Sequence, residues 1–327
     1  MSQQTRAHPV ELSALRHPGA DAARIWPALL VTTKPGITRL VTITALFGFA
    51  IEALVSQQLT LGTVLIRVVV VAVGAALSAA GANALNMWME HERDALMRRT
   101  AARPLPAGTL SDRTVLTWGL TLSAGGVLTL LAFAGPSAGL VALGGVALYV
   151  LVYTPLKPRT VWNTLVGAVP GAVPPLIGAA AAVNAPGFEP LVSPMGWALF
   201  ALMVVWQIPH FLAIAWMYRD DYARAGMRML PSVDRTGAAT AATLITTAAL
   251  LIAASLTPVI AAPDAAGPVY AAFAVLTGLA YTWLAVRFAR RRTQAAAKAV
   301  FFASIAHLPV LMLALLAEVA VRTLLLA

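Results

Sequence analysis

From Ile37 to its end, the chain alternates between long apolar runs and short polar breaks. Nine of the runs have about 18 to 28 residues, enough for an α-helix to cross about 30 Å of hydrocarbon. They lie near residues 37–55, 63–88, 115–134, 137–154, 161–183, 195–217, 237–262, 267–288 and 299–326. The breaks carry turn-forming residues, as in Gly135-Pro136-Ser137. The pattern predicts an all-α protein with about nine transmembrane helices in one bundle.

The composition agrees with a polytopic membrane protein. Of the 327 residues, 59% are hydrophobic and only 11% are charged, whereas soluble globular domains have about 25% charged residues. The chain contains no cysteine. Disulfides, zinc thiolate sites and thiol nucleophiles are therefore excluded.

The basic residues indicate how the chain is oriented. The net charge is +10, but the basic residues lie between apolar runs, which favours a membrane surface over nucleic acid as the partner. All but two of the 23 lysines and arginines fall on the same side of the predicted spans as the N-terminus. By the positive-inside rule, that side is cytoplasmic. We expect the membrane to be the inner (plasma) membrane of the cell. We expect residues 1–36 to form a partly disordered cytoplasmic arm and residues 37–327 to form the intramembrane domain.

The stretch from Asn86 to Pro106 begins inside an apolar run and ends in a basic turn. A spacing of four residues places Asn86, Glu90 and Asp94 on one helical face. Amide and carboxylate oxygens suit Mg²⁺, which takes the rest of its shell from water and substrate phosphate oxygens. Arginines can then bind the phosphates in a forked geometry, and three follow at once: Arg98, Arg99 and Arg103. The stretch predicts a metal–diphosphate site, and the alternative interpretation is a solvated helix end at the inner membrane face.

The same stretch resembles a known family. The run N-x-x-x-[DE]-x-x-x-D followed by R-x-x-x-R-P-L-P resembles the first signature of the UbiA-type intramembrane prenyltransferases, which are related to 4-hydroxybenzoate polyprenyltransferase. Within that family, the resemblance is to the haem O synthase (protohaem IX farnesyltransferase) branch and runs from about Lys34 to the end of the chain. The segments that carry it are Lys34-Pro35, Asn86-Met87-Trp88, Tyr153-Thr154-Pro155-Leu156-Lys157 and Trp206-Gln207-Ile208-Pro209-His210-Phe211.

The resemblance implies a Mg²⁺-dependent transfer of a farnesyl group from farnesyl diphosphate to a vinyl group of haem b, with water completing the product. It implies Mg²⁺ on Asn86, Glu90 and Asp94, and Lys157 as a further diphosphate-binding residue beside the three arginines. The implied partners are farnesyl diphosphate, haem b, the lipid bilayer and a downstream haem-modifying enzyme. Two alternatives are a relative that uses a quinone precursor or a chlorophyllide as acceptor, and a transporter. A transporter needs charges near the membrane midplane, whereas these charges cluster at one face.

A second polar segment starts at His210 and includes Asp220 and Asp221. Here the wider family has a second aspartate-rich motif, and the haem branch typically has histidine where other members start the motif with aspartate. The resemblance implies that His210 contacts the porphyrin, either as an axial ligand of the iron or as the partner of a propionate. The alternative is a histidine that only hydrogen-bonds to a neighbouring helix. Adjacent acids point about 100° apart on a helix, so at most one of the two aspartates is expected to face the chamber.

Other features of the sequence leave alternatives open. Lys157 and Arg159 are either phosphate ligands or ordinary membrane-interface anchors, and Lys34 either reaches the same site or extends to the interface. His91 is expected to line the site, and His307 to be structural. The Gly- and Pro-rich run from 167 to 178 predicts either a kinked wall for a ligand or close helix packing.

A weak internal repeat relates the two polar segments. Residues 86–106 and 210–231 each run from a polar residue in a helix, through acids, to an arginine followed by Leu-Pro, and they lie four helices apart. Two similar helical halves that face each other would bring both segments to one cytoplasm-facing chamber.

Overall fold

The computed structural model describes residues 18–185 and 187–325, and all the regular structure in these ranges is helical. Nine helical segments in this part of the chain are long and apolar enough to cross a membrane. They are α2 (Pro35–Ser56), α3 (Leu61–Asp94), α4 (Asp112–Phe133), the segment Pro136–Leu156, α7 (Asn163–Ala182), α8 (Pro194–Met217), α11 (Ala238–Ala261), α12 (Pro268–Arg291) and α13 (Gln294–Leu325). The predicted all-α architecture with nine spans is confirmed.

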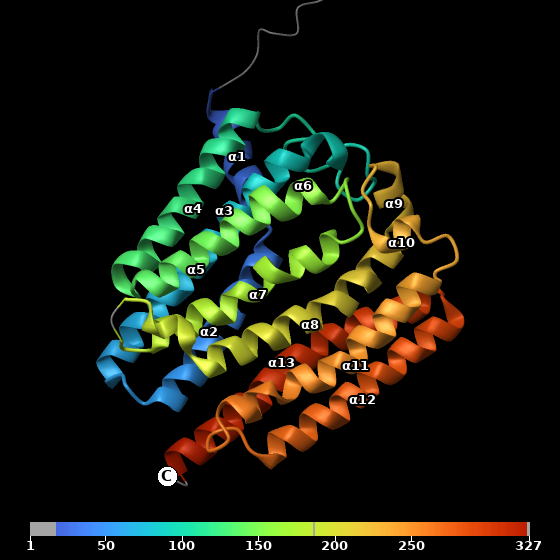
Figure 1. Cartoon of the computed structure of the whole chain (residues 1–327). Coiled ribbons are helices and arrows are strands. Elements are labelled where there is room, and N and C mark those ends of the chain that lie inside the picture. Colours follow the sequence, from blue (N-terminus) through green and yellow to red (C-terminus); the bar gives the residue numbers. More distant parts are fainter. Residues whose placement is uncertain (1–17, 186, 326–327) are drawn as a thin grey trace, which may run out of the picture.

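Shorter helices interrupt or join the spans. The fourth span consists of α5 (Pro136–Ala147), a π-helical turn η1 (Leu148–Tyr153) and α6 (Thr154–Leu156). The connecting helices are α1 (Pro18–Thr32), η2 (Glu189–Val192), α9 (Arg219–Arg224) and α10 (Leu230–Val233). Figure 1 shows α1, α6, α9 and α10 at the end of the bundle opposite the C-terminus.

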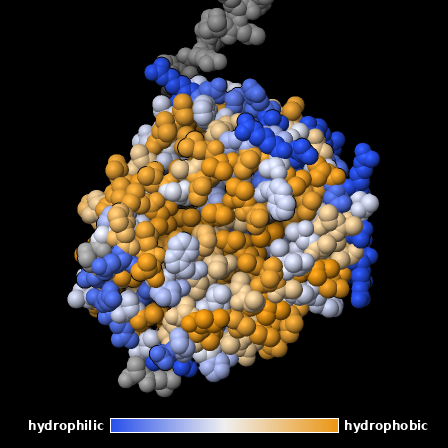
Figure 2. Space-filling model, viewed as in Figure 1, coloured by the Kyte–Doolittle hydropathy of each residue, from blue (hydrophilic) through white to orange (hydrophobic). Residues whose placement is uncertain are grey.

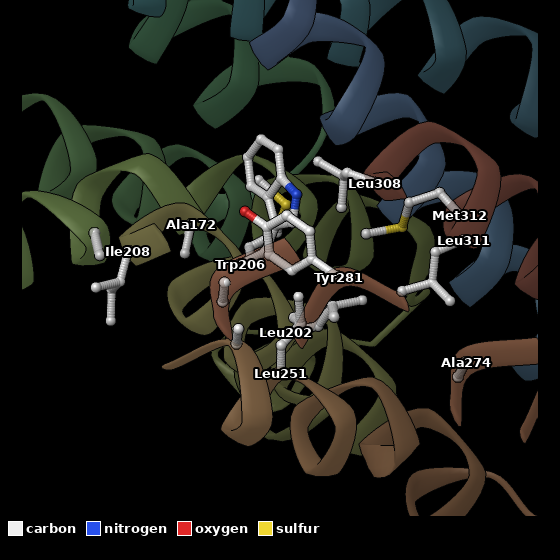
Figure 3. Packing of buried hydrophobic residues seen from close by; sticks show 14 of the residues in the cluster. Ala172, Leu202, Trp206, Ile208, Leu251, Ala274, Tyr281, Leu308, Leu311 and Met312 are labelled. Carbon is white, nitrogen blue, oxygen red and sulfur yellow. The ribbon is translucent and has the colours of Figure 1, made fainter. Parts of the chain in front are cut away.

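The bundle consists of two halves with separate apolar cores. Residues of α2, α3, α4, α5 and α7 form one core, which includes Phe49 and Leu130. Residues of α8, α11, α12 and α13 form most of the other, larger core, and Figure 3 shows part of it, with Trp206 and Tyr281 near the centre of the view. Helices α2 and α7 pack against each other, and both also contact α8, which joins the halves.

The contact between α2 and α7 depends on glycines. A Cβ atom on Gly178 would overlap the backbone of Ala45 and Phe49, and one on Gly48 would overlap the backbone of Pro175. Small residues let two helix backbones approach closely, which is a common way to join helices in a membrane. This geometry favours close helix packing as the role of the Gly- and Pro-rich run in α7.

The distribution of hydrophobic and hydrophilic residues on the surface suits a protein that spans a bilayer. Figure 2 shows a broad hydrophobic band with hydrophilic residues gathered toward the two ends of the bundle. The end formed by α1, α6, α9 and α10 and by the connection 95–111 is called the basic end here. Arg67 and Arg322 lie at the other end, where each donates to backbone carbonyls, Ala181 O at 2.9 Å and Asp264 O at 3.0 Å.

Part of the predicted N-terminal arm is helical, because α1 covers Pro18–Thr32. Ala28 and Leu29 of α1 pack with Leu105 and Leu110 of the connection after α3. The buried pair ties this helix to the basic end. Residues 1–17 of the arm lie outside the described residues.

Candidate active site

Helix α3 continues beyond its apolar run and ends at Asp94. Three polar residues therefore lie on successive turns of one helix face: Asn86, Glu90 and Asp94. Their exposed fractions are only 1%, 6% and 1%. Burying an amide and two carboxylates is costly unless each has a polar or charged partner. The charges around these residues are consequently central to the site.

Both carboxylates are paired with cations. Lys157 Nζ lies 2.7 Å from Glu90 Oε1 and donates to Oε2 at 3.0 Å. Arg103 Nη1 donates to Asp94 Oδ2 at 2.6 Å. Lys157 follows the fourth span and Arg103 lies in the turn after α3, so two separate segments bring cations, both predicted to bind phosphate, onto the predicted metal ligands.

The amide of Asn86 joins a third segment to the same face. Lys34 Nζ donates to Asn86 Oδ1 at 2.7 Å, and Asn86 Nδ2 donates to Thr154 Oγ1 at 2.9 Å. Thr154 in turn donates to Tyr149 O at 2.9 Å, across the π-helical turn. Lys34 precedes α2 with φ of 48°, in the left-handed region that non-glycine residues seldom adopt.

The surroundings shift the pKa values of Lys34 and Lys157 in opposite directions. Burial, together with the positive charges of Arg103 and Lys157, lowers the pKa of Lys34 to about 7. Burial is also the largest single influence on Lys157 and acts in the same direction, but the Glu90 carboxylate, Tyr153 and Tyr149 together outweigh it and raise the pKa of Lys157 above its ordinary value. The Glu90 carboxylate thus favours the charged form of Lys157, while burial and the neighbouring cations disfavour the charged form of Lys34.

The other predicted arginines lie farther out. Arg98 and Arg99 are exposed, and the Arg99 guanidinium lies 4.9 Å from the centroid of the Tyr218 ring. Arg159 is also exposed. Arg93, which the sequence reasoning did not single out, donates to Ala225 O at 2.8 Å.

The two polar segments of the chain meet at the basic end. Met97 of the first segment is buried against Ala225 and Met227 of the second, and the Arg93 bond spans the same junction. This is the arrangement expected if two repeated halves face each other.

The two aspartates of the second segment differ in exposure, because the Asp221 side chain is only 13% exposed. The Asp220 side chain is 90% exposed and its carboxylate is 3.7 Å from Arg219, whereas Asp221 pairs with Arg224 at 3.1 Å. Among the described residues, no group of three His, Cys, Asp or Glu side chains comes together to hold a metal ion. A metal at this end would therefore depend on the amide and carboxylates of α3 and on oxygens of a bound ligand.

The histidines have different surroundings. His210 Nδ1 lies 2.7 Å from Ser304 Oγ on α13, which is the expected bond to a neighbouring helix. His307 is buried and its ring stacks on Tyr281, with centroids 5.6 Å apart. His91 Nδ1 lies 2.7 Å from Trp88 O in its own helix.

A helical bundle of membrane-spanning length, with buried amide and carboxylate oxygens paired with cations at one end, is typical of a membrane protein with a polar site near one membrane face. The model of the UbiA prenyltransferase family matches residues 41–306. The chain belongs to this family.

Curated relatives and solved structures agree with this assignment. A protoheme IX farnesyltransferase of Solibacter usitatus is 41% identical over 283 residues, which cover 85% of this chain and 94% of the relative. The protein of the same name from Salinibacter ruber is 41% identical over 294 residues, which cover 90% and 99% of the two chains. A digeranylgeranylglyceryl phosphate synthase structure has the same fold, with a TM-score of 0.71 and 15% identity over 91% of this chain and 99% of that one. A UbiA homologue from Archaeoglobus fulgidus bound to GPP and Mg²⁺ matches with a TM-score of 0.61 and 14% identity over 90% and 99% of the two chains.

Proposed function

We propose that this protein transfers a farnesyl group from farnesyl diphosphate to a vinyl group of protohaem IX (haem b), which gives haem O. The observation that carries the reaction class is the pairing of buried Glu90 with Lys157 and of buried Asp94 with Arg103. A site of this kind can hold a metal on the carboxylates and a diphosphate on the cations. Relatives with the name protoheme IX farnesyltransferase, 41% identical over most of the chain, support the acceptor.

The donor set of α3 fits Mg²⁺, because all its donors are hard oxygens. The Cα atoms of Asn86 and Asp94 are about 12 Å apart along the helix, whereas opposite ligands of one Mg²⁺ ion are about 4 Å apart. Glu90 and Asp94 would therefore share one ion, and Asn86 would hold a second ion or a metal-bound water. Bound Mg²⁺ would neutralise the charge that develops on the departing diphosphate.

The cations of the site would change partner when the substrate binds. Lys157 and Arg103 form ion pairs with the carboxylates of Glu90 and Asp94 in this structure. A diphosphate would bind these two cations more strongly than the carboxylates do, because it offers several charged oxygens. Moving to the phosphate, they would stabilise the negative charge that grows on the leaving group. The carboxylates would at the same time be released to ligate metal.

The reaction breaks the C1–O bond of farnesyl diphosphate, the π bond of the vinyl group and one O–H bond of water, and it forms one C–C bond and one C–O bond. The C1–O bond of farnesyl diphosphate breaks and its electron pair leaves with the diphosphate, while the π electrons of the haem vinyl group form the new C–C bond. The resulting cation, next to the porphyrin ring, takes the oxygen of a water molecule, which loses a proton. The product is the hydroxyethylfarnesyl side chain.

The acceptor would be held on the second half of the bundle through His210. Imidazole is a good ligand for iron and a poor one for Mg²⁺, which prefers oxygen. A histidine at the position where other family members begin an aspartate-rich motif is expected to change the ligand that this segment binds.

The basic end would face the cytoplasm of a cell with this protein in its inner membrane. Both substrates would then reach the site from that side, and the lipid-soluble product would pass in the membrane to a haem-modifying enzyme. The positive-inside rule supports this orientation.

An acceptor panel tests the function. Membranes that contain the protein are incubated with farnesyl diphosphate, Mg²⁺ and one of three acceptors: haem b, an aromatic quinone precursor or a chlorophyllide. Farnesylation of haem b alone is the expected result. Farnesylation of another acceptor but not of haem would overturn the proposed substrate and leave the reaction class in place.

A further inference from the structure

The imidazole of His210 stacks on two aromatic rings. The ring centroid of Trp206 is 5.2 Å away with an interplanar angle of 19°, and that of Phe301 is 5.2 Å away on α13 with an angle of 27°. The near-parallel rings restrict the imidazole to one plane. Its edge, which carries the two nitrogens, is the part that remains for directional polar contacts.

Ser304 decides which nitrogen of that edge carries the proton. Its Oγ lies 2.7 Å from His210 Nδ1 and also donates to Phe301 O at 2.6 Å. A hydroxyl group has a single hydrogen. Two oxygens 2.6 Å apart need a hydrogen between them, so we assign that hydrogen to the bond with the Phe301 carbonyl. Oγ then accepts from Nδ1–H, and the lone pair of the neutral imidazole is on Nε2.

Ser304 is itself held in place. It is completely buried, and its carbonyl oxygen accepts from Trp206 Nε1 at 3.0 Å. One residue of α13 therefore fixes the position of Trp206 through its backbone and the tautomer of His210 through its hydroxyl.

We propose that Ser304 is a positioning residue for the acceptor: it holds His210 as the Nδ1–H tautomer so that Nε2 can ligate the iron of a metalloporphyrin. The inference rests on the proposed function, because it concerns the haem acceptor. It also selects between two roles for His210, since a neutral imidazole with a lone pair on Nε2 can bind iron but cannot donate from Nε2 to a propionate. Histidines that bind metals normally donate their other N–H to an oxygen acceptor, which fixes the tautomer and raises ligand basicity.

The tautomer can be measured without any ligand. The full chain, labelled with ¹⁵N-histidine and reconstituted in lipid, gives separate nitrogen resonances for protonated and unprotonated ring positions, and His210→Ala assigns those of His210. We expect His210 to be protonated at Nδ1, and Ser304→Ala to produce a mixture of tautomers. Protonation at Nε2 in the wild-type protein would overturn the proposal.

Haem binding provides the second readout. Haem is titrated into wild-type protein and variants, and iron ligation is followed by the visible spectrum and the iron–histidine stretching frequency. Ser304→Ala should weaken haem affinity by about 10- to 100-fold and lower that frequency, and Ser304→Thr, which keeps the hydroxyl, should restore both. The matched control is Ser255→Ala, because Ser255 is also completely buried and donates to a carbonyl of its own helix, Leu251 O at 2.7 Å. The Ser255→Ala variant should bind haem with the same affinity as the wild-type protein.

The outcomes separate the role of Ser304 from the role of His210. Unchanged haem affinity and spectrum in His210→Ala would remove His210 from the acceptor site, and the positioning role with it. Loss of haem in His210→Ala together with wild-type affinity and frequency in Ser304→Ala would overturn only the role of Ser304. Mg²⁺-dependent binding of farnesyl diphosphate, retained in each variant, shows that the protein is folded.

Discussion

Arg103 Nη1 and Asp94 Oδ2 are 2.6 Å apart, although the residues are separated by nine positions and a turn in the chain. The guanidinium is a typical phosphate ligand and the carboxylate a typical Mg²⁺ ligand. Their ion pair gives the buried Asp94 carboxylate a cationic partner. Lys157 and Glu90 form the same kind of pair.

This pairing predicts that Mg²⁺ and farnesyl diphosphate bind cooperatively. Mg²⁺ alone must displace a cation from each carboxylate, whereas the diphosphate draws both cations away. We expect Mg²⁺ affinity, measured by calorimetry without haem, to rise at least tenfold when farnesyl diphosphate is present, and the reverse effect to be equal in size. Equal Mg²⁺ affinities with and without the diphosphate would contradict the coupling.

Asp94→Asn and Glu90→Gln should abolish turnover while the protein stays in the membrane. Each change removes a charge from the proposed metal site and keeps nearly the same shape, and loss of a good ligand costs at least about tenfold in metal affinity or activity. The control is Glu92→Gln, an exposed acid on the same helix, which should keep normal activity. Near-normal turnover of Asp94→Asn at low Mg²⁺ would show that the metal assignment is wrong.

His210→Ala and Arg103→Ala should have opposite effects on the two substrates. His210→Ala should weaken haem binding and leave Mg²⁺-dependent farnesyl diphosphate binding nearly intact, and Arg103→Ala should do the reverse. The two affinities are measured separately on each variant. An equal loss of diphosphate affinity in both variants would place His210 in the phosphate site.

Gly178→Ala should destabilise the bundle, because the new Cβ would overlap the backbone of Ala45 and Phe49. Overpacking of this kind costs about 1–3 kcal/mol, which would lower the thermal unfolding midpoint in detergent. Gly144→Ala is the matched control, since a Cβ on this helical glycine of α5 meets no atom within 4 Å. A midpoint for Gly178→Ala as high as that for Gly144→Ala would mean that the α2–α7 contact is looser than described.

The orientation predicts a cytoplasmic N-terminus and, with nine crossings, a C-terminus on the other side. Fusions of a reporter that is active only in the cytoplasm should be active at the N-terminus and inactive at the C-terminus. Activity at both ends would be incompatible with nine crossings.

Much of this architecture could be predicted from the sequence, because the signals involved are local. Apolar runs of sufficient length mark the spans, and a spacing of four residues places Asn86, Glu90 and Asp94 on one face. The end of α3 was harder to place, since the charged residues from Glu90 to Asp94 interrupt the apolar run but remain helical.

The partners within the site could not be predicted in this way, since they depend on packing between distant segments. Lys34 and Asn86 are 52 residues apart in the chain, Lys157 and Glu90 are 67 apart, and Ser304 and His210 are 94 apart. A lysine near a membrane interface looks the same in sequence whether it lies in the headgroups or reaches a buried carboxylate. Ser304 lies in an apolar helix, and the residues around it in the sequence do not indicate that it contacts His210.

The central claim is prenyl transfer to haem, and product analysis with purified components tests it most directly. The protein in lipid nanodiscs is incubated with farnesyl diphosphate, haem b and Mg²⁺, and the porphyrin is analysed by mass spectrometry in ordinary water and in ¹⁸O-labelled water. The account predicts a haem that has gained one farnesyl group and one hydroxyl, with the heavy oxygen in that hydroxyl and one diphosphate released per product. Diphosphate release while haem b remains unmodified would contradict it.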